Sequence, residues 1–113
     1  MKSNDEIISF ENREDAEILL KKSRKRIDEI DNALFDLISQ RTSLAEGIVL
    51  SKMYLDIPIY DKSREDAIHK KIEGLAVEND LDVDIVNQIV DMLTILSKNE
   101  QEKILRRNVN GQY

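Results

Sequence analysis

Along the first half of the chain, apolar residues recur every three or four positions, which is the period of a helix that buries one face. Pro58 is the one proline, and its ring cannot continue a helix. Asn12 or Ser3 could cap the start of the helix by accepting backbone N–H groups. We therefore expect one long helix over residues 13–54. Its clearest apolar stripe consists of Ile27, Ile30, Leu34, Leu37, Leu44 and Ile48.

Two shorter helices are expected after the proline. Asp61 is a typical N-cap residue and Glu65 suits the first turn that follows it, so we expect the second helix to begin after Asp61 and to end within residues 77–82. A third helix is predicted from about Val83 to Arg106, and residues 107–113 are expected to form a frayed tail. The inward-facing residues predicted for the third helix are Ile85, Ile89, Val90, Leu93 and Leu96.

The first predicted helix is too long for the rest of the chain to cover. Roughly 40 residues with a rise of ~1.5 Å each make a rod of ~60 Å. A compact chain of this size has a radius of gyration of ~13 Å, and hence a diameter about half that length. We therefore expect an all-α fold, in which three-helix protomers with one very long N-terminal helix pair as an intertwined homodimer, most economically with C2 symmetry.

Composition agrees with a single all-helical domain over residues 1–113 and excludes several kinds of site. Charged residues make up 35% of the 113 residues and aromatic residues 4%, as in proteins built from exposed helices. The chain has no cysteine and one histidine, so we expect no disulfide, no metal site and no metal cofactor.

Charge and hydropathy narrow the expected partners and location. The net charge of −6 disfavours nucleic-acid binding, which needs a basic face, although it permits a local cationic pocket. No segment reaches the 18 or more apolar residues of a membrane span, and the first residues do not resemble a signal peptide. We expect a cytoplasmic protein without nucleic-acid or membrane partners.

Arg41 interrupts the apolar stripe where a leucine would be expected. Burying an unpaired guanidinium costs many kcal/mol, so Arg41 needs either an acidic partner in the chain, a position at the edge of the stripe, or an anionic ligand. Lys52 lies eleven residues later, and eleven steps of about 100° return to within ~20° of the same face. Two cations on one face favour an anionic ligand, which the guanidinium could bind through two N–H groups.

Arg24 differs from these two cations. It lies seventeen residues before Arg41 and therefore ~100° further round the helix. In a dimer of long helices, it could point into the cavity of the partner. Taken alone, a cation within the run "KKSRKR" is more often solvated.

Two further groups of polar residues have a structural and a functional interpretation. Asp61, Arg64 and Glu65 lie in "YDKSRED", where they could form a helix cap with a local ion pair or could hold a ligand hydroxyl. Ser97 and Gln101 are four residues apart, on one face of the third predicted helix. They could mark the emergence of that helix into solvent, or they could line a polar pocket.

Taken together, these segments resemble the all-helical (AroQ-type) chorismate mutases, whose members form intertwined dimers of three-helix protomers. The resemblance covers about residues 24–101 and leaves residues 1–23 as a helical N-terminal extension. The segments that carry it are "RKRIDEIDNALFDLISQR" (24–41), Lys52, "IPIYDKSRE" (57–65) and "SKNEQ" (97–101).

The resemblance implies a role for each matching residue. Arg41 looks like the arginine that binds a substrate carboxylate, and Lys52 like the lysine at the carboxylate and the ether oxygen. Gln101 resembles the side chain that donates to the ether oxygen. Glu65, with the backbone of Asp61, resembles the group that holds the ring hydroxyl.

The resemblance also implies the reaction and three supporting residues. Arg24 looks like the arginine contributed by the partner chain, and Arg64 and Ser97 match supporting positions in the substrate pocket. The expected reaction is the Claisen [3,3] rearrangement of the dianion chorismate to prephenate, in phenylalanine and tyrosine biosynthesis, which needs no cofactor. Two alternatives are an isochorismate pyruvate lyase on the same fold and a non-enzymatic helical dimerisation module, in which Arg41 would pair with an acid of its own chain.

Overall fold

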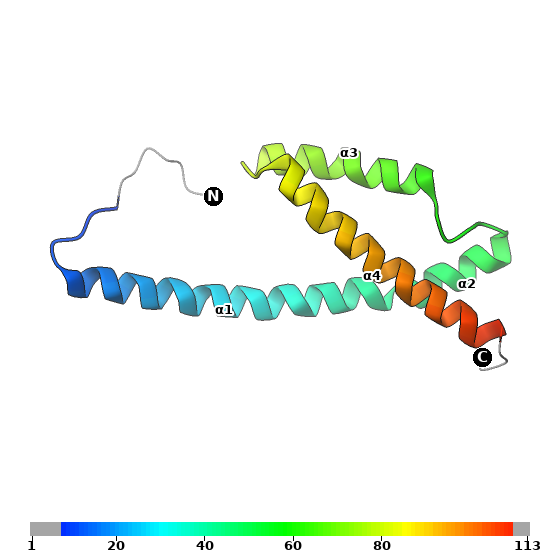
Figure 1. The fold of residues 1–113 in the computed structure, drawn as a ribbon, viewed down its shortest axis with the longest axis horizontal. Coiled ribbons are helices and arrows are strands. Elements are labelled where there is room, and N and C mark those ends of the chain that lie inside the picture. The colour runs from blue at the N-terminus through cyan, green and yellow to red at the C-terminus, as the bar shows by residue number, and fades with distance from the viewer. Residues whose placement is uncertain (1–7, 110–113) are drawn as a thin grey trace. The chain divides into compact units, whose positions relative to one another are not determined.

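A computed structural model describes residues 8–109, which contain helices and no strand, so the predicted all-α class is confirmed. Expectations for residues 1–7 and 110–113, the alternative cap Ser3 among them, lie outside the described residues. The helices are α1 (Arg13–Ser43), α2 (Ala45–Leu55), α3 (Lys62–Glu78) and α4 (Val83–Val109), shown in Figure 1.

The chain divides into two compact units, residues 1–37 and 38–113. The first unit contains the start of α1, where the Asp15 backbone N–H donates to Oδ1 of Asn12 over 2.9 Å. The predicted cap by Asn12 is therefore confirmed. Residues 8–12 are not helical, so within the described part of the extension expected to be helical, residues 8–23, the helix begins at Arg13.

The predicted long N-terminal helix is present as α1 and α2, with an irregularity at Leu44. The backbone of Leu44 keeps right-handed helical angles (φ −70°, ψ −12°), and its N–H donates to the carbonyl of Arg41 over 3.2 Å, one residue nearer than in an α-helix. The hydroxyl of Thr42 donates to the carbonyl four residues earlier at 2.8 Å, and that of Ser43 to the one three residues earlier at 2.6 Å. Such side-chain bonds compete with regular helix bonds, which accounts for the local tightening.

The turn between α2 and α3 has defined ends. Asp56 adopts the left-handed conformation (φ 57°), and the following N–H, of Ile57, donates to the carbonyl of Lys52 over 2.8 Å, which closes the end of α2. Asp61 then caps α3, because its Oδ1 accepts the backbone N–H of Arg64 at 3.1 Å. The predicted start of the second helix is confirmed.

Helix α4 packs against both α2 and α3 and so builds the core of the second unit. The buried apolar residues are small or medium in size: Ala45, Val49, Ala76, Val90 and Ile104. The inward positions predicted for α4 are partly wrong for the single chain, since Ile85, Ile89 and Leu96 are 57%, 55% and 45% exposed. These three residues lie outside the faces of α4 that α2 and α3 cover.

The end of α4 also differs from expectation. The helix includes residues 107–109, which were expected to belong to the frayed tail. Arg106 and Arg107 lie in its last turn, where positive charge interacts favourably with the helix dipole. Within the described residues, no helix is both long and apolar enough to cross a membrane.

The start of α4 supplies a stability prediction. Asp82 Oδ1 accepts the backbone N–H of Ile85 at 2.9 Å. Removing such a cap costs about 1 kcal/mol. We expect Asp82→Ala to lower the free energy of unfolding in urea by about that amount, and Asp82→Asn to lower it much less. Glu102→Ala, at an exposed position of the same helix, is the control at equal protein concentration; equal stability of the two alanine variants would contradict the cap.

Candidate functional site

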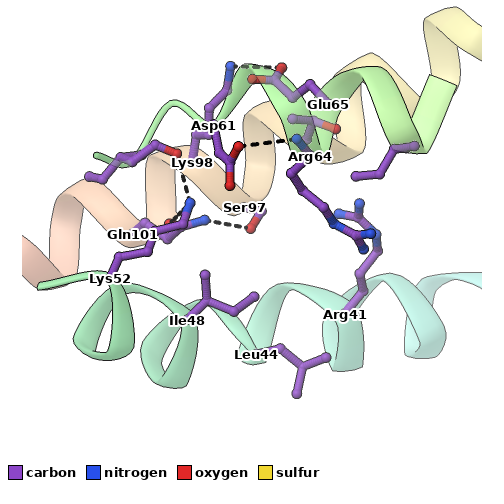
Figure 2. A pocket seen from close by; sticks show the side chains of 13 residues that line it. Arg41, Leu44, Ile48, Lys52, Asp61, Arg64, Glu65, Ser97, Lys98 and Gln101 are labelled. Atoms are coloured by element: carbon purple, nitrogen blue, oxygen red, sulfur yellow. Dashed lines mark hydrogen bonds and ion pairs between the residues drawn. The ribbon is translucent and has the colours of Figure 1, made fainter. Parts of the chain in front are cut away.

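A pocket of about 420 Å³ lies within the second unit, between residues of all four helices and the α2–α3 turn (Figure 2). Seven of the eight predicted site residues line it. The complete lining consists of Arg41, Leu44, Ile48, Lys52, Ile59, Asp61, Arg64, Glu65, Ile68, Thr94, Ser97, Lys98 and Gln101.

Two guanidinium groups meet at one end of the pocket. Arg41 is half-buried in the last turn of α1, and its Nη1 donates to the backbone carbonyl of Leu93 over 3.1 Å. Figure 2 shows the side chain of Arg64, from the first turn of α3, pointing toward that of Arg41. Because like charges repel, this end of the pocket is suited to an anion that bridges both cations.

Lys52 and Gln101 form the other polar end of the pocket. Lys52 Nζ donates to the backbone carbonyl of Ile59 at 2.8 Å and to Oε1 of Gln101 at 3.2 Å. Gln101 is only 4% exposed, and its Nε2 donates to the hydroxyl of Ser97 over 3.1 Å. A lysine has three N–H donors and a primary amide two, so each side chain retains one donor for a ligand.

The carboxylate of Glu65 lies on the α3 side of the pocket. Its Oε1 is 3.5 Å from Nζ of Lys98, and the two side chains are 26% and 29% exposed. Its Oε2 is buried and accepts no hydrogen bond from the described residues. A buried carboxylate oxygen without a donor is unfavourable, which makes this atom the natural acceptor for a ligand hydroxyl.

The lining is cationic although the chain is acidic. It contains four basic side chains (Arg41, Lys52, Arg64 and Lys98) and two acidic ones (Asp61 and Glu65), a formal balance of +2. The whole chain carries −6. A small dianion fits this local balance.

One electrostatic feature lies outside this lining. Beside the pocket, a hydrogen bond to the Asp66 carboxylate raises the pKa of the exposed Lys62. Among residues 8–109, no group of three acidic, histidine or cysteine side chains could hold a metal ion.

Arg24 is the predicted site residue that does not line this pocket. It is an exposed residue of α1 in the first unit, so its expected contribution from a partner chain stays a prediction.

Sequence reasoning missed Thr94 and Lys98 as pocket residues. The signal was their spacing with Ser97 and Gln101, since positions 94, 97, 98 and 101 share one face of α4. A lysine in a charged helix is usually solvated, and this made Lys98 inconspicuous.

Comparison with known proteins gives a consistent result. Residues 23–102 match the model of the family described as chorismate mutase type II. A chorismate mutase of Methanocaldococcus jannaschii is 39% identical over 87 residues, which cover 77% of this chain and 88% of that protein. A bifunctional chorismate mutase/prephenate dehydratase of Buchnera aphidicola subsp. Schizaphis graminum is 28% identical over 87 residues, which cover 77% of this chain and 23% of that protein.

Proposed function

This chain belongs to the chorismate mutase type II family, and we propose that the pocket lined by Arg41, Lys52 and Gln101 is where it converts chorismate to prephenate. The reaction is a step of aromatic amino acid biosynthesis. The observation that carries the proposal is the convergence of cations and amide donors from separate segments on one pocket of suitable charge.

The reaction makes modest chemical demands on the protein. Within one molecule of chorismate, the ether C–O bond breaks while a C–C bond forms, and no group or proton leaves. The protein must hold the substrate in the compact conformer in which the bonding carbons approach each other. Arg41 and Arg64 at one end of the pocket, and Lys52 at the other, can fix that conformer by binding the two carboxylates.

Electrostatic stabilisation of the transition state falls to Lys52 and Gln101. As the C–O bond breaks, negative charge grows on the ether oxygen. Lys52 Nζ is already fixed by Ile59 and Gln101, and the Gln101 amide by Ser97, so their remaining donors need little reorganisation. Donors fixed in advance stabilise developing charge more than they stabilise the ground state.

The ring hydroxyl of the substrate has a matching acceptor. Oε2 of Glu65 is buried without a donor from the described residues, and Asp61 holds the start of α3 through its cap. In the proposed complex, the hydroxyl donates to this oxygen. The substrate thereby supplies a donor to an acceptor that no described residue pairs with.

The proposed enzyme is an intertwined homodimer in which Arg24 enters the partner's pocket. No residue of α1 is buried in the single chain. Its stripe residues Ile27, Ile30, Leu34 and Leu37 are 54%, 48%, 50% and 59% exposed. A second copy would cover this stripe, and contiguous apolar exposure of this kind is typical of an interface.

A direct assay tests the reaction. Incubated with chorismate, the purified protein is expected to form prephenate, detected by its acid-catalysed conversion to phenylpyruvate. Isochorismate is the comparison substrate, since a lyase on this fold would release salicylate and pyruvate from it. Faster turnover of isochorismate would assign the pocket to the lyase reaction, and inactivity on both substrates would contradict an enzymatic role.

The two central cations supply a second prediction. Replacing either side chain with alanine removes a charged contact to the substrate. Arg41→Ala and Lys52→Ala are therefore each expected to lower kcat/KM by at least about 10²-fold, while the helical circular dichroism spectrum is retained. Lys71→Ala, an exposed lysine of α3 outside the pocket, is the matched control. Near-normal turnover by either pocket variant would assign the reaction elsewhere.

The contribution of Arg24 across the dimer is tested by complementation. Arg24→Ala and Arg41→Ala homodimers are each expected to be nearly inactive. After mixing in equal amounts and refolding, half of the dimers are mixed, and each mixed dimer has one site with both lesions and one with none. Activity should therefore return to about one site in four. No recovery would show that Arg24 acts within its own chain, and an active Arg24→Ala homodimer would show that it has no role in the site.

A further inference from the structure

Lys98 is a pocket residue to which neither the family motif nor the proposed mechanism gives a task. We propose that Lys98 is a positioning residue that holds one oxygen of Glu65, so that the other oxygen stays available to the substrate's ring hydroxyl. This inference rests on the proposed function. It concerns the recognition of the hydroxyl, and not the charge on the ether oxygen.

The two oxygens of the Glu65 carboxylate have different surroundings. Oε1 is 3.5 Å from Nζ of Lys98 on α4 (Figure 2). Oε2 is buried and has no hydrogen-bond donor among the described residues. A cation on the Oε1 side attracts that oxygen and limits the rotation of the carboxylate, and this keeps Oε2 in place as an acceptor.

Lys98 is itself fixed from a second direction. Its Nζ lies 5.5 Å from the centre of the Tyr60 ring, which is a cation–π distance. Tyr60 directly precedes Asp61, the cap of the helix that carries Glu65. The lysine thus joins α4 to both the entrance and the first turn of α3.

Burial distinguishes this pair from the ordinary ion pairs of the surface. The side chains of Lys98 and Glu65 are 29% and 26% exposed, whereas those of Lys62 and Asp66, on the same helix α3, are 72% and 65% exposed. Water and salt screen the exposed pair much more strongly. The Lys98–Glu65 pair therefore retains enough interaction to orient a side chain.

The competing role for Lys98 is direct contact with a substrate carboxylate, since it is one of the four cations of the pocket. The two roles differ in the conditions under which removing Lys98 lowers activity. A positioning role acts only through Glu65 and the hydroxyl. A direct role acts on the carboxylates whether or not Glu65 and the hydroxyl are present.

A double-mutant cycle separates the two roles. We expect Lys98→Met to lower kcat/KM for chorismate about 5- to 20-fold in the wild-type background and less than about 2-fold in a Glu65→Gln background. With a chorismate analogue in which hydrogen replaces the ring hydroxyl, Lys98→Met should again cost less than about 2-fold. Lys98→Arg should recover most of the loss, because it keeps the charge.

Two further variants serve as controls. Lys103→Met, at an exposed position of α4 outside the pocket, should match the wild type. Lys98→Gln repeats the test with a polar neutral side chain in case the methionine variant folds poorly.

The outcomes separate this inference from the proposed function. Failure of the wild-type protein to convert chorismate would overturn the proposed function itself. If the wild type is active, either of two results would overturn the inference. The first is that the Lys98 variants have the kcat/KM of the wild type. The second is that their loss of kcat/KM persists in the Glu65→Gln background and with the analogue.

Discussion

The site depends on the position of one ammonium group, that of Lys52. Its Nζ lies within hydrogen-bond distance of the Ile59 carbonyl (2.8 Å) and of Oε1 of Gln101 (3.2 Å), and it thereby joins α2, the α2–α3 turn and α4. The turn it holds leads within two residues to Asp61, which caps α3 and sets the position of Glu65. The same ammonium group orients Gln101, which is only 4% exposed and is held from its other end by Ser97. One cation therefore fixes both the acceptor and the donor sides of the pocket.

The two central cations of the pocket, Arg41 and Lys52, donate hydrogen bonds to neutral groups. Arg41 donates to a backbone carbonyl, and Lys52 donates to a carbonyl and an amide oxygen. Neutral acceptors stabilise a half-buried cation without cancelling its charge, and a carboxylate in the same place would cancel it. The positive potential of the pocket is thereby kept for a ligand, within a chain whose net charge is −6. Lys98 differs because it faces Glu65, which fits a role in orienting a side chain.

Several features of the fold could be predicted from sequence because they depend on local chemistry. The bounds of the helices are predicted to within a few residues by the spacing of apolar residues, by Pro58, and by the caps Asn12 and Asp61. Arg41 and Lys52 line one pocket, as their eleven-residue spacing predicts, because the irregularity at Leu44 keeps right-handed helical angles.

Features set by tertiary contacts could not be predicted in this way. The period of α4 indicates an apolar face but not which element covers it, and Ile85 and Ile89 are exposed in the single chain. Lys98 resembles any solvated lysine until the fold places it opposite Glu65.

Stability and catalysis are linked in the proposed dimer. Among the described residues of the single chain, the buried apolar side chains are two alanines, two valines and one isoleucine, while the stripe of α1 is exposed. Burial of apolar area is the main favourable term in folding, at roughly 25 cal/mol per Å², so a core of small side chains supplies little of it. The second copy that would cover the stripe would also, as proposed, carry Arg24 to the pocket. In this arrangement, the contact that supplies the missing apolar burial also completes the binding site for a dianion, so an assembled dimer and a complete active site form together.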